Sequence, residues 1–114
     1  MQNEIFVNVV RTTGDLAGVF EYDGETAYFY LYRTKGASAA KIIDALHIIS
    51  GHIDFAQKDI SIRWDYSETK VALSIKDAIW AVFDCNSGQK FGGNYGVGER
   101  PNIPESIRSI KFPH

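Results

Sequence analysis

The sequence predicts a mainly β domain, an antiparallel sheet or β-sandwich built from consecutive hairpins, with at most one or two short helices. Three observations support this fold class: short runs rich in β-branched and aromatic residues, clear two-residue alternation in the second half, and an Asp-Gly turn between two such runs. The chain has 114 residues and is 45% hydrophobic. We therefore expect one domain over residues 1–114 with a core of its own.

The first half begins with three predicted strands. Residues 5–10 are rich in β-branched side chains, and residues 16–22 and 25–33 flank the dipeptide Asp23-Gly24. Asp-Gly between strand-like runs predicts a hairpin, because a type I′ turn needs two residues that tolerate positive φ. We therefore expect the second and third strands to pair directly.

Residues 39–50 leave two alternatives open. Ala39, Ile42, Ile43, Leu46 and Ile49 share one helix face, and this spacing fits slightly better than the strand-like alternation of every second residue from position 42 to 48. A helix at 39–50 would make the fold α+β.

The second half predicts a three-stranded meander. Apolar and polar residues alternate over 59–65 and 70–76, whereas residues 78–84 are apolar on both faces, as in a central strand. Hairpin counting predicts about six or seven strands in all.

The C-terminal part is less regular. Residues 92–102 read as a long Gly-rich loop that covers an edge or presents a surface. Pro104 at a first helical position predicts a single short turn, with a last strand over 107–112 as the alternative.

Charge and composition disfavour several partners. The formal net charge is −2, and the 12 basic and 14 acidic residues are scattered without a Lys/Arg cluster. We therefore expect no nucleic-acid and no membrane binding, since both depend on basic clusters. The first ten residues have no basic residue or long apolar run, and the chain has one cysteine, so we expect a cytoplasmic protein without a disulfide.

One cluster has the residue types of a metal site. Asp44, His47, His52 and Asp54 are ligand types that zinc and iron accept. On a helix Asp44 and His47 would share a face, whereas on a strand they would point to opposite faces. The spacing matches no established ligand motif, and solvated residues are the favoured alternative, so we expect no cofactor.

A row of tyrosines is the candidate binding surface. Tyr28, Tyr30 and Tyr32 fall on one face of the third strand, and Trp64 and Tyr66 would extend such a surface. Tyrosine offers a large rigid contact area with a polar tip, which suits sugar stacking or protein binding. The favoured alternative is that the row is one wall of the core.

Other catalytic patterns are missing. The Gly-rich run at 92–98 lacks the Lys-Ser/Thr ending of a P-loop and is not followed by a helix of useful length. Cys85 has no basic residue at a spacing that would activate it, and no Gly-x-Ser-x-Gly motif occurs.

Five segments together resemble a small bacterial family of uncharacterised proteins: YDGETAYFY at 22–30, IDALHI at 43–48, IRWD at 62–65, AVFD at 81–84 and the terminal Phe112-Pro113. The resemblance implies consecutive β-hairpins, which favours a strand at 40–49, and a compact bacterial, cytoplasmic protein. It implies no activity. The Gly-rich run at 92–98 departs from the family pattern.

Two classes of function follow. The first is a non-catalytic bacterial protein-binding module of the inhibitor or immunity type, favoured by small size, mild acidity and the tyrosine row. The alternative is a small-molecule or sugar-binding domain, or a metal-dependent enzyme that uses Asp44, His47 and His52. Exposed strand edges can pair with the edge of a second molecule, so a homodimer is a further expectation.

Overall fold

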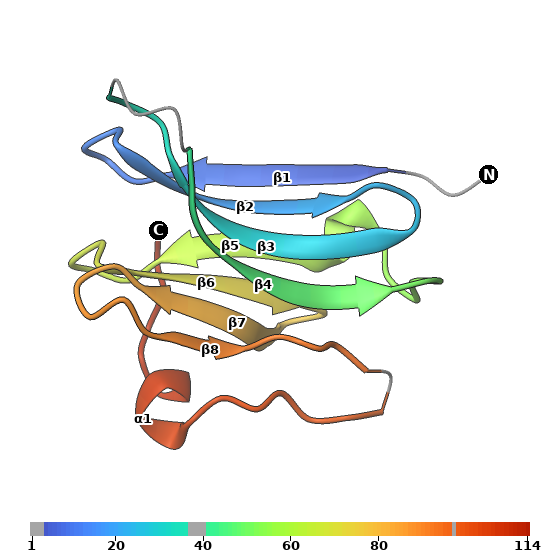
Figure 1. Ribbon diagram of the computed structural model, residues 1–114. Coiled ribbons are helices and arrows are strands. Elements are labelled where there is room, and N and C mark those ends of the chain that lie inside the picture. Colours follow the sequence, from blue (N-terminus) through green and yellow to red (C-terminus); the bar gives the residue numbers. More distant parts are fainter. Residues whose placement is uncertain (1–3, 37–40, 97) are drawn as a thin grey trace.

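The computed structural model describes residues 4–36, 41–96 and 98–114 and consists of two stacked antiparallel sheets (Figure 1). The first sheet contains, in order, β1 (Ile5–Val10), β2 (Leu16–Tyr22), β3 (Thr26–Arg33) and β4 (Ile42–Ser50). The second contains, in order, β5 (Ile60–Trp64), β6 (Lys70–Ile75), β7 (Ala78–Asp84) and β8 (Lys90–Gly92). A 3-10 helix (Gln57–Asp59) precedes β5, and α1 (Glu105–Arg108) follows β8.

The mainly β prediction is confirmed, with more strands than hairpin counting predicted. The extra strand is β8, which has 3 residues and is too short for its alternation to be recognised in the sequence. It pairs with β7 and makes β7 a central strand.

The hairpin predicted at Asp23-Gly24 joins β2 to β3. Its geometry differs from the expected type I′ turn. Gly24 has a positive φ of 99°, whereas Asp23 does not have a positive φ. The Asp23 carboxylate instead accepts hydrogen bonds from the N–H groups of Glu25 and Thr26, at 2.9 and 2.8 Å. Asp23 thus holds the turn with its side chain, as Asp does in Asx turns.

The segment from 42 to 50 is strand β4, so the helix alternative at 39–50 is wrong for its described part; residues 39 and 40 lie outside the described ranges. The register of β4 against β3 shifts at two points, and Ile43 and Ile48 are the extra residues there. Each β-bulge resets the two-residue alternation. This explains why the apolar residues of β4 resemble a helical pattern.

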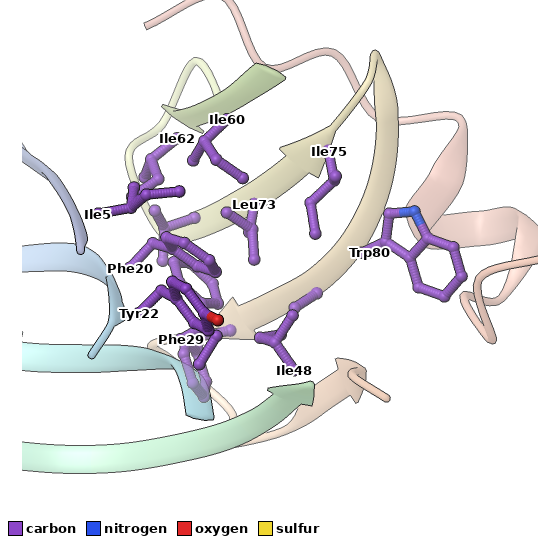
Figure 2. Packing of buried hydrophobic residues seen from close by; sticks show 14 of the residues in the cluster. Ile5, Phe20, Tyr22, Phe29, Ile48, Ile60, Ile62, Leu73, Ile75 and Trp80 are labelled. Atoms are coloured by element: carbon purple, nitrogen blue, oxygen red, sulfur yellow. The ribbon is translucent and has the colours of Figure 1, made fainter. Parts of the chain in front are cut away.

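The core lies between the sheets. Figure 2 shows Phe20 and Phe29 of the first sheet directed toward Leu73 of the second, and all three are fully buried. The rings of Phe29 and Phe83 stack across the sandwich with centroids 5.0 Å apart. Face-to-face sheets of this kind bury one side of every strand in a single apolar layer.

A second apolar layer covers the other side of β7. Ile103 and Ile107, from the C-terminal segment with α1, pack against Ala72 and Val82. This confirms the prediction that strand 78–84 is buried on both faces. Neither α1 nor the 3-10 helix is long and apolar enough to cross a membrane, and the described ranges contain no other helix.

The Gly-rich segment closes one side of the sandwich. After β8 it runs along β4, where the N–H groups of Asn94 and Tyr95 donate to the carbonyls of His47 and Ile48, at 2.9 and 2.7 Å. The prediction that this segment covers an edge is confirmed for the described residues; residue 97 lies outside them.

Candidate functional site

The outer face of the first sheet carries large apolar side chains. Phe29 and Leu31 point into the core, so the alternating residues of β3 point outward. Phe6 on β1 and Ile42 on β4 remain 54% and 51% exposed on the same sheet. We call this surface the tyrosine face and define it by these residues: Phe6, Asn8, Val10, Ala17, Val19, Glu21, Tyr28, Tyr30, Tyr32, Thr34 and Ile42.

The tyrosines form an ordered row. The rings of Tyr28 and Tyr30 stack with centroids 5.8 Å apart and planes 17° from parallel. The ring of His47, opposite Tyr28 in the register of β3 and β4, meets Tyr28 edge-on at 5.5 Å. Because these rings contact one another, their side chains are held in place before any partner binds.

A shallow groove of about 380 Å³ runs over the tyrosine face. Its lining includes the small side chain of Ala17 and the larger apolar side chains of Val19 and Phe6. Polar groups enter the groove only from Asn8, Glu21, Thr34 and the tyrosine hydroxyls of the described lining residues. An apolar groove with few polar groups is the usual form of a ligand-binding surface.

The formal charge on the described lining of the groove is negative. Among the described lining residues Glu21 alone carries a formal charge. The pKa of Tyr30 is raised above its ordinary value, first by partial burial and then by electrostatic interaction with Glu21, Tyr28 and Asp23, of which the two carboxylates are charged at neutral pH. Burial would disfavour any charge at this place, and the two carboxylates are what favours a cation over an anion near Tyr30.

The structure reverses the favoured interpretation of the tyrosine row, because the row faces outward and not into the core. Trp64 does not extend it, since this residue is 0% exposed and its indole N–H donates to the carbonyl of Val9 at 3.0 Å. Tyr66 lies in the turn between β5 and β6, is 72% exposed and contacts the ring of His114. The tyrosine face therefore excludes Trp64 and Tyr66.

The predicted metal ligands on β4 do not converge. The strand register places Asp44 opposite Leu31 and His47 opposite Tyr28, so their side chains leave opposite faces of the sheet. Asp44 pairs with Lys90 at 2.9 Å. The ring nitrogens of His47 are hydrogen-bonded, Nδ1 to the amide oxygen of Asn94 at 3.1 Å and Nε2 to the hydroxyl of Ser50 at 2.9 Å.

The other two predicted ligands lie in the loop that follows β4. Asp54 pairs with Lys76 at 2.9 Å and accepts a hydrogen bond from the Tyr95 hydroxyl at 2.8 Å. The Lys76 ammonium and this hydroxyl hold the pKa of Asp54 below its usual range. His52 is exposed in the same loop. Within the described ranges, no group of three or more His, Cys, Asp or Glu side chains is placed to hold a metal ion.

Cys85 does not have the environment of an activated thiolate. Burial is the main cause that raises the pKa of its thiol above the ordinary value, and the Arg11 cation only partly opposes this effect. At neutral pH the group is therefore a protonated thiol, which is a poor nucleophile.

Sequence reasoning missed the part of the tyrosine face that β1 and β2 supply, including Phe6, Val10 and Val19. β1 is apolar at nearly every position, so alternation alone did not show which of its faces is exposed. The signal that was available is Asn8, the one polar residue of β1, which marks the outward face together with Phe6 and Val10.

Comparison with known proteins agrees with the resemblance noted in the sequence. A protein of Haemophilus influenzae, described as uncharacterized, is 31% identical over 96 residues, which cover 74% of this chain and 58% of the relative. The chain thus spans less than two thirds of the length of that relative. No solved structure matches this chain.

A family model matches residues 1–102, a range that includes both sheets. The model is described as an uncharacterized protein conserved in bacteria. The match covers nearly the whole chain, and the resemblance predicted from the sequence is confirmed. This chain belongs to the bacterial family DUF2251.

Proposed function

We propose that this protein is a non-catalytic protein-binding module of the bacterial cytoplasm, of the inhibitor or immunity type, and that its partner docks on the tyrosine face. The observation that supports this proposal is a continuous outward surface on which Phe6, Val10, Tyr28 and Ile42 all remain substantially exposed. Clustered large apolar side chains on a surface are typical of interaction sites, whereas scattered ones are not.

The charge on the tyrosine face indicates the chemistry of the partner. Glu21 lies opposite Tyr28 in the register of β2 and β3, and both Glu21 and Tyr30 line the groove. A cation there would gain an ion pair with the carboxylate and a contact with a tyrosine ring. We therefore propose a partner that presents an arginine or lysine flanked by apolar side chains. Arginine suits this place best, because it can pair with a carboxylate and stack on an aromatic ring together.

The non-catalytic part of the proposal is supported by the state of the candidate reactive groups. The ring nitrogens of His47 are engaged by Asn94 and Ser50, and the Cys85 thiol is held in its protonated form. Neither side chain lines the groove. A protein partner fits such a surface better than a substrate that needs a general base.

The test is to capture the partner from lysate of the source bacterium, purify it, and measure its affinity for variants by calorimetry. Tyr30→Ala is expected to weaken binding about tenfold or more, because buried interface tyrosines are frequent hot spots. The matched control is Tyr66→Ala, which removes an exposed tyrosine outside the tyrosine face.

Charge is tested with a second pair of variants. Glu21→Gln is expected to slow association and reduce its salt dependence, whereas Glu99→Gln, in an exposed loop, leaves both unchanged. A partner that binds Tyr30→Ala as tightly as the wild type would exclude the tyrosine face as its docking surface.

The groove also favours a second candidate, a small apolar ligand, because its volume of about 380 Å³ lies within the usual range of ligand pockets. The probe is the fluorescent dye Nile red. Saturable binding that Val19→Arg abolishes and Tyr66→Ala preserves supports this candidate, and dye fluorescence that both variants leave unchanged excludes it.

A further inference from the structure

The outer edge of β1 has no strand beside it in the described ranges (Figure 1). The N–H of Arg11, which follows β1, donates to the carbonyl of Leu16 at 3.0 Å. In an antiparallel ladder every second residue bonds to the same neighbour, so the odd-numbered residues of β1 bond to β2. The N–H and C=O groups of Phe6, Asn8 and Val10 therefore point to the open edge.

The other sheet edges carry protecting features that β1 lacks. Along β4, the segment after β8 donates backbone hydrogen bonds to His47 and Ile48. The end of β5 is bonded by the N–H of His114 to the carbonyl of Trp64, at 3.1 Å. β8 is only 3 residues long and ends at Gly92, which has a positive φ, as does Gly93 directly after it. Short, bulged or covered edges are how proteins prevent unwanted strand pairing.

β1 shows none of the usual features of a protected edge. Its sequence, IFVNVV, contains no charge and no proline, and its register with β2 is regular from Ile5 to Val10. Two of its outward side chains, Phe6 and Val10, are 54% and 44% exposed. An open, regular and apolar edge is a template for another strand.

We infer that two copies of this chain associate through their β1 strands, which pair antiparallel about a two-fold axis at Asn8. In this register Asn8 faces Asn8 of the second copy, Phe6 faces Val10, and Val7 faces Val9. These three kinds of pair are apolar or amide–amide, and the edge groups of the even-numbered residues meet across the axis. An isologous contact of this kind closes on itself.

The neighbouring registers are poorer. Residues that oppose each other must lie on the same face of the sheet, so the register can move only in steps that keep this alternation. One step toward the N-terminus places the Glu4 carboxylate opposite Val10, and one step toward the C-terminus places Arg11 opposite Val7. Arg11 is already engaged by Asp15 at 2.7 Å and lies over the Trp64 ring. The axis at Asn8 also places Arg11 opposite Ile5, so charge alone does not separate the three registers. Asn8 does, because it faces Phe6 after the step toward the N-terminus and Val10 after the step toward the C-terminus, and faces a second amide only when the axis lies at Asn8.

This association continues the first sheet of one copy into that of the other and leaves the outer faces exposed. Phe6 and Val10 belong both to the pairing edge and to the groove, so the two tyrosine faces would adjoin along the axis. The pairing uses the backbone of β1 and does not depend on the proposed function. Tyr30 lies two strands away from the pairing edge, and Tyr30→Ala is expected to leave the pairing intact.

The test is sedimentation equilibrium of the full chain at concentrations up to the millimolar range. A concentration-dependent dimer is expected, and Asn8→Lys weakens it about tenfold or more because two like charges then face each other on the axis. Asn8 is exposed, so this change leaves the fold intact. The matched control is Asn102→Lys, the same substitution at an exposed site outside the sheets, which leaves the dimer unchanged.

The register is tested by oxidation of single-cysteine variants in a Cys85→Ser background. Directly opposed residues of a hydrogen-bonded pair have Cα atoms about 5.5 Å apart, which a disulfide can span, so Asn8→Cys is expected to cross-link. Phe6→Cys would place its two thiols roughly 14 Å apart along the strands and remain uncross-linked. A chain that is monomeric at every concentration, a dimer that Asn8→Lys does not weaken, or equal cross-linking at both positions would overturn the inference.

Discussion

Gly92 occupies a place where the chain has no room for a side chain. It has φ of 87°, and a Cβ built there would lie 2.0 Å from the carbonyl oxygen of Trp80 and 2.7 Å from Ile103. The backbone passes this closely because the chain must turn from β8 toward β4. The Gly-rich run was interpreted from the sequence as a loop. At position 92, however, glycine is required because the packing leaves no room for a side chain.

Gly92→Ala is therefore expected to lower the free energy of unfolding by about 3 kcal/mol or more, since backbone strain and a clash act together. The control is Gly88→Ala, at φ of 77° with nothing within 4 Å of the added Cβ. In this control variant only backbone strain acts, and it lowers the free energy of unfolding by about 1 kcal/mol. Urea denaturation measures both, and an equal loss in the two variants would contradict the packing role of Gly92.

The tyrosine row illustrates the limit of residue-level reasoning. The alternation of β3 correctly separates Tyr28, Tyr30 and Tyr32 from Phe29 and Leu31. Which set is buried depends on whether the opposite sheet packs on one side or the other, and both sets are largely apolar. The favoured choice of the tyrosines as a core wall was wrong. Phe29 and Leu31 fill the core instead, because burying them leaves no hydroxyl group without a hydrogen-bond partner.

At the level of elements, the C-terminal segment acts as a lid on the outer side of β7. Ile107 is the buried residue of α1 and contacts the layer around Val82. The helix has only 4 residues and is too short to be stable alone. Its position therefore depends on the apolar contacts that Ile107 and Ile103 make with the sheet.

Ile107→Glu is expected to detach this segment while the two sheets remain folded, because a charge cannot be buried there without a partner. We expect the free energy of unfolding to fall by about 2 kcal/mol, near the lower end for loss of a buried isoleucine. Limited proteolysis should cut the segment between β8 and α1 faster. Ser106→Glu, on the exposed side of α1, is the control, and equal cleavage rates in the two variants would contradict this role.

β4 shows why an element type was left open by the sequence. Its two bulges, at Ile43 and Ile48, interrupt the alternation that identifies the other strands. In β5 and β6 the alternation is undisturbed or nearly so, and both strands were predicted to within a residue or two. Bulges depend on the neighbouring strand, so local sequence does not show where they occur.

In the whole molecule, Tyr95 links the two sheets on the side where β4 meets β8. Its N–H donates to the carbonyl of Ile48, and its hydroxyl donates to Asp54. Its ring contacts Trp80 edge-on, with centroids 4.7 Å apart. Burial, with a further contribution from Asp54, raises the pKa of Tyr95 to about 12 from an ordinary value of 10.0.

This shift predicts sensitivity to alkali. A tyrosine whose pKa is higher in the folded than in the unfolded state contributes full stability below pH 10, and this contribution is lost as the pH rises from about 10 to about 12. Tyr95→Phe should reduce the slope of stability against pH in this range, measured by urea denaturation at each pH. Tyr66→Phe, at an exposed tyrosine, is the control and should leave the slope unchanged.

The sequence by itself determined the β class, seven of the eight strands in some form, the hairpin at Asp23-Gly24 and the two-sided burial of β7. It did so because side-chain alternation and turn preferences are local properties. Only the tertiary structure decided which face of the first sheet is exposed, where Trp64 lies, and that the glycines after β8 attach it to β4. These features depend on packing between residues far apart in the chain, and an apolar strand such as β1 fits either face until its neighbours are in place.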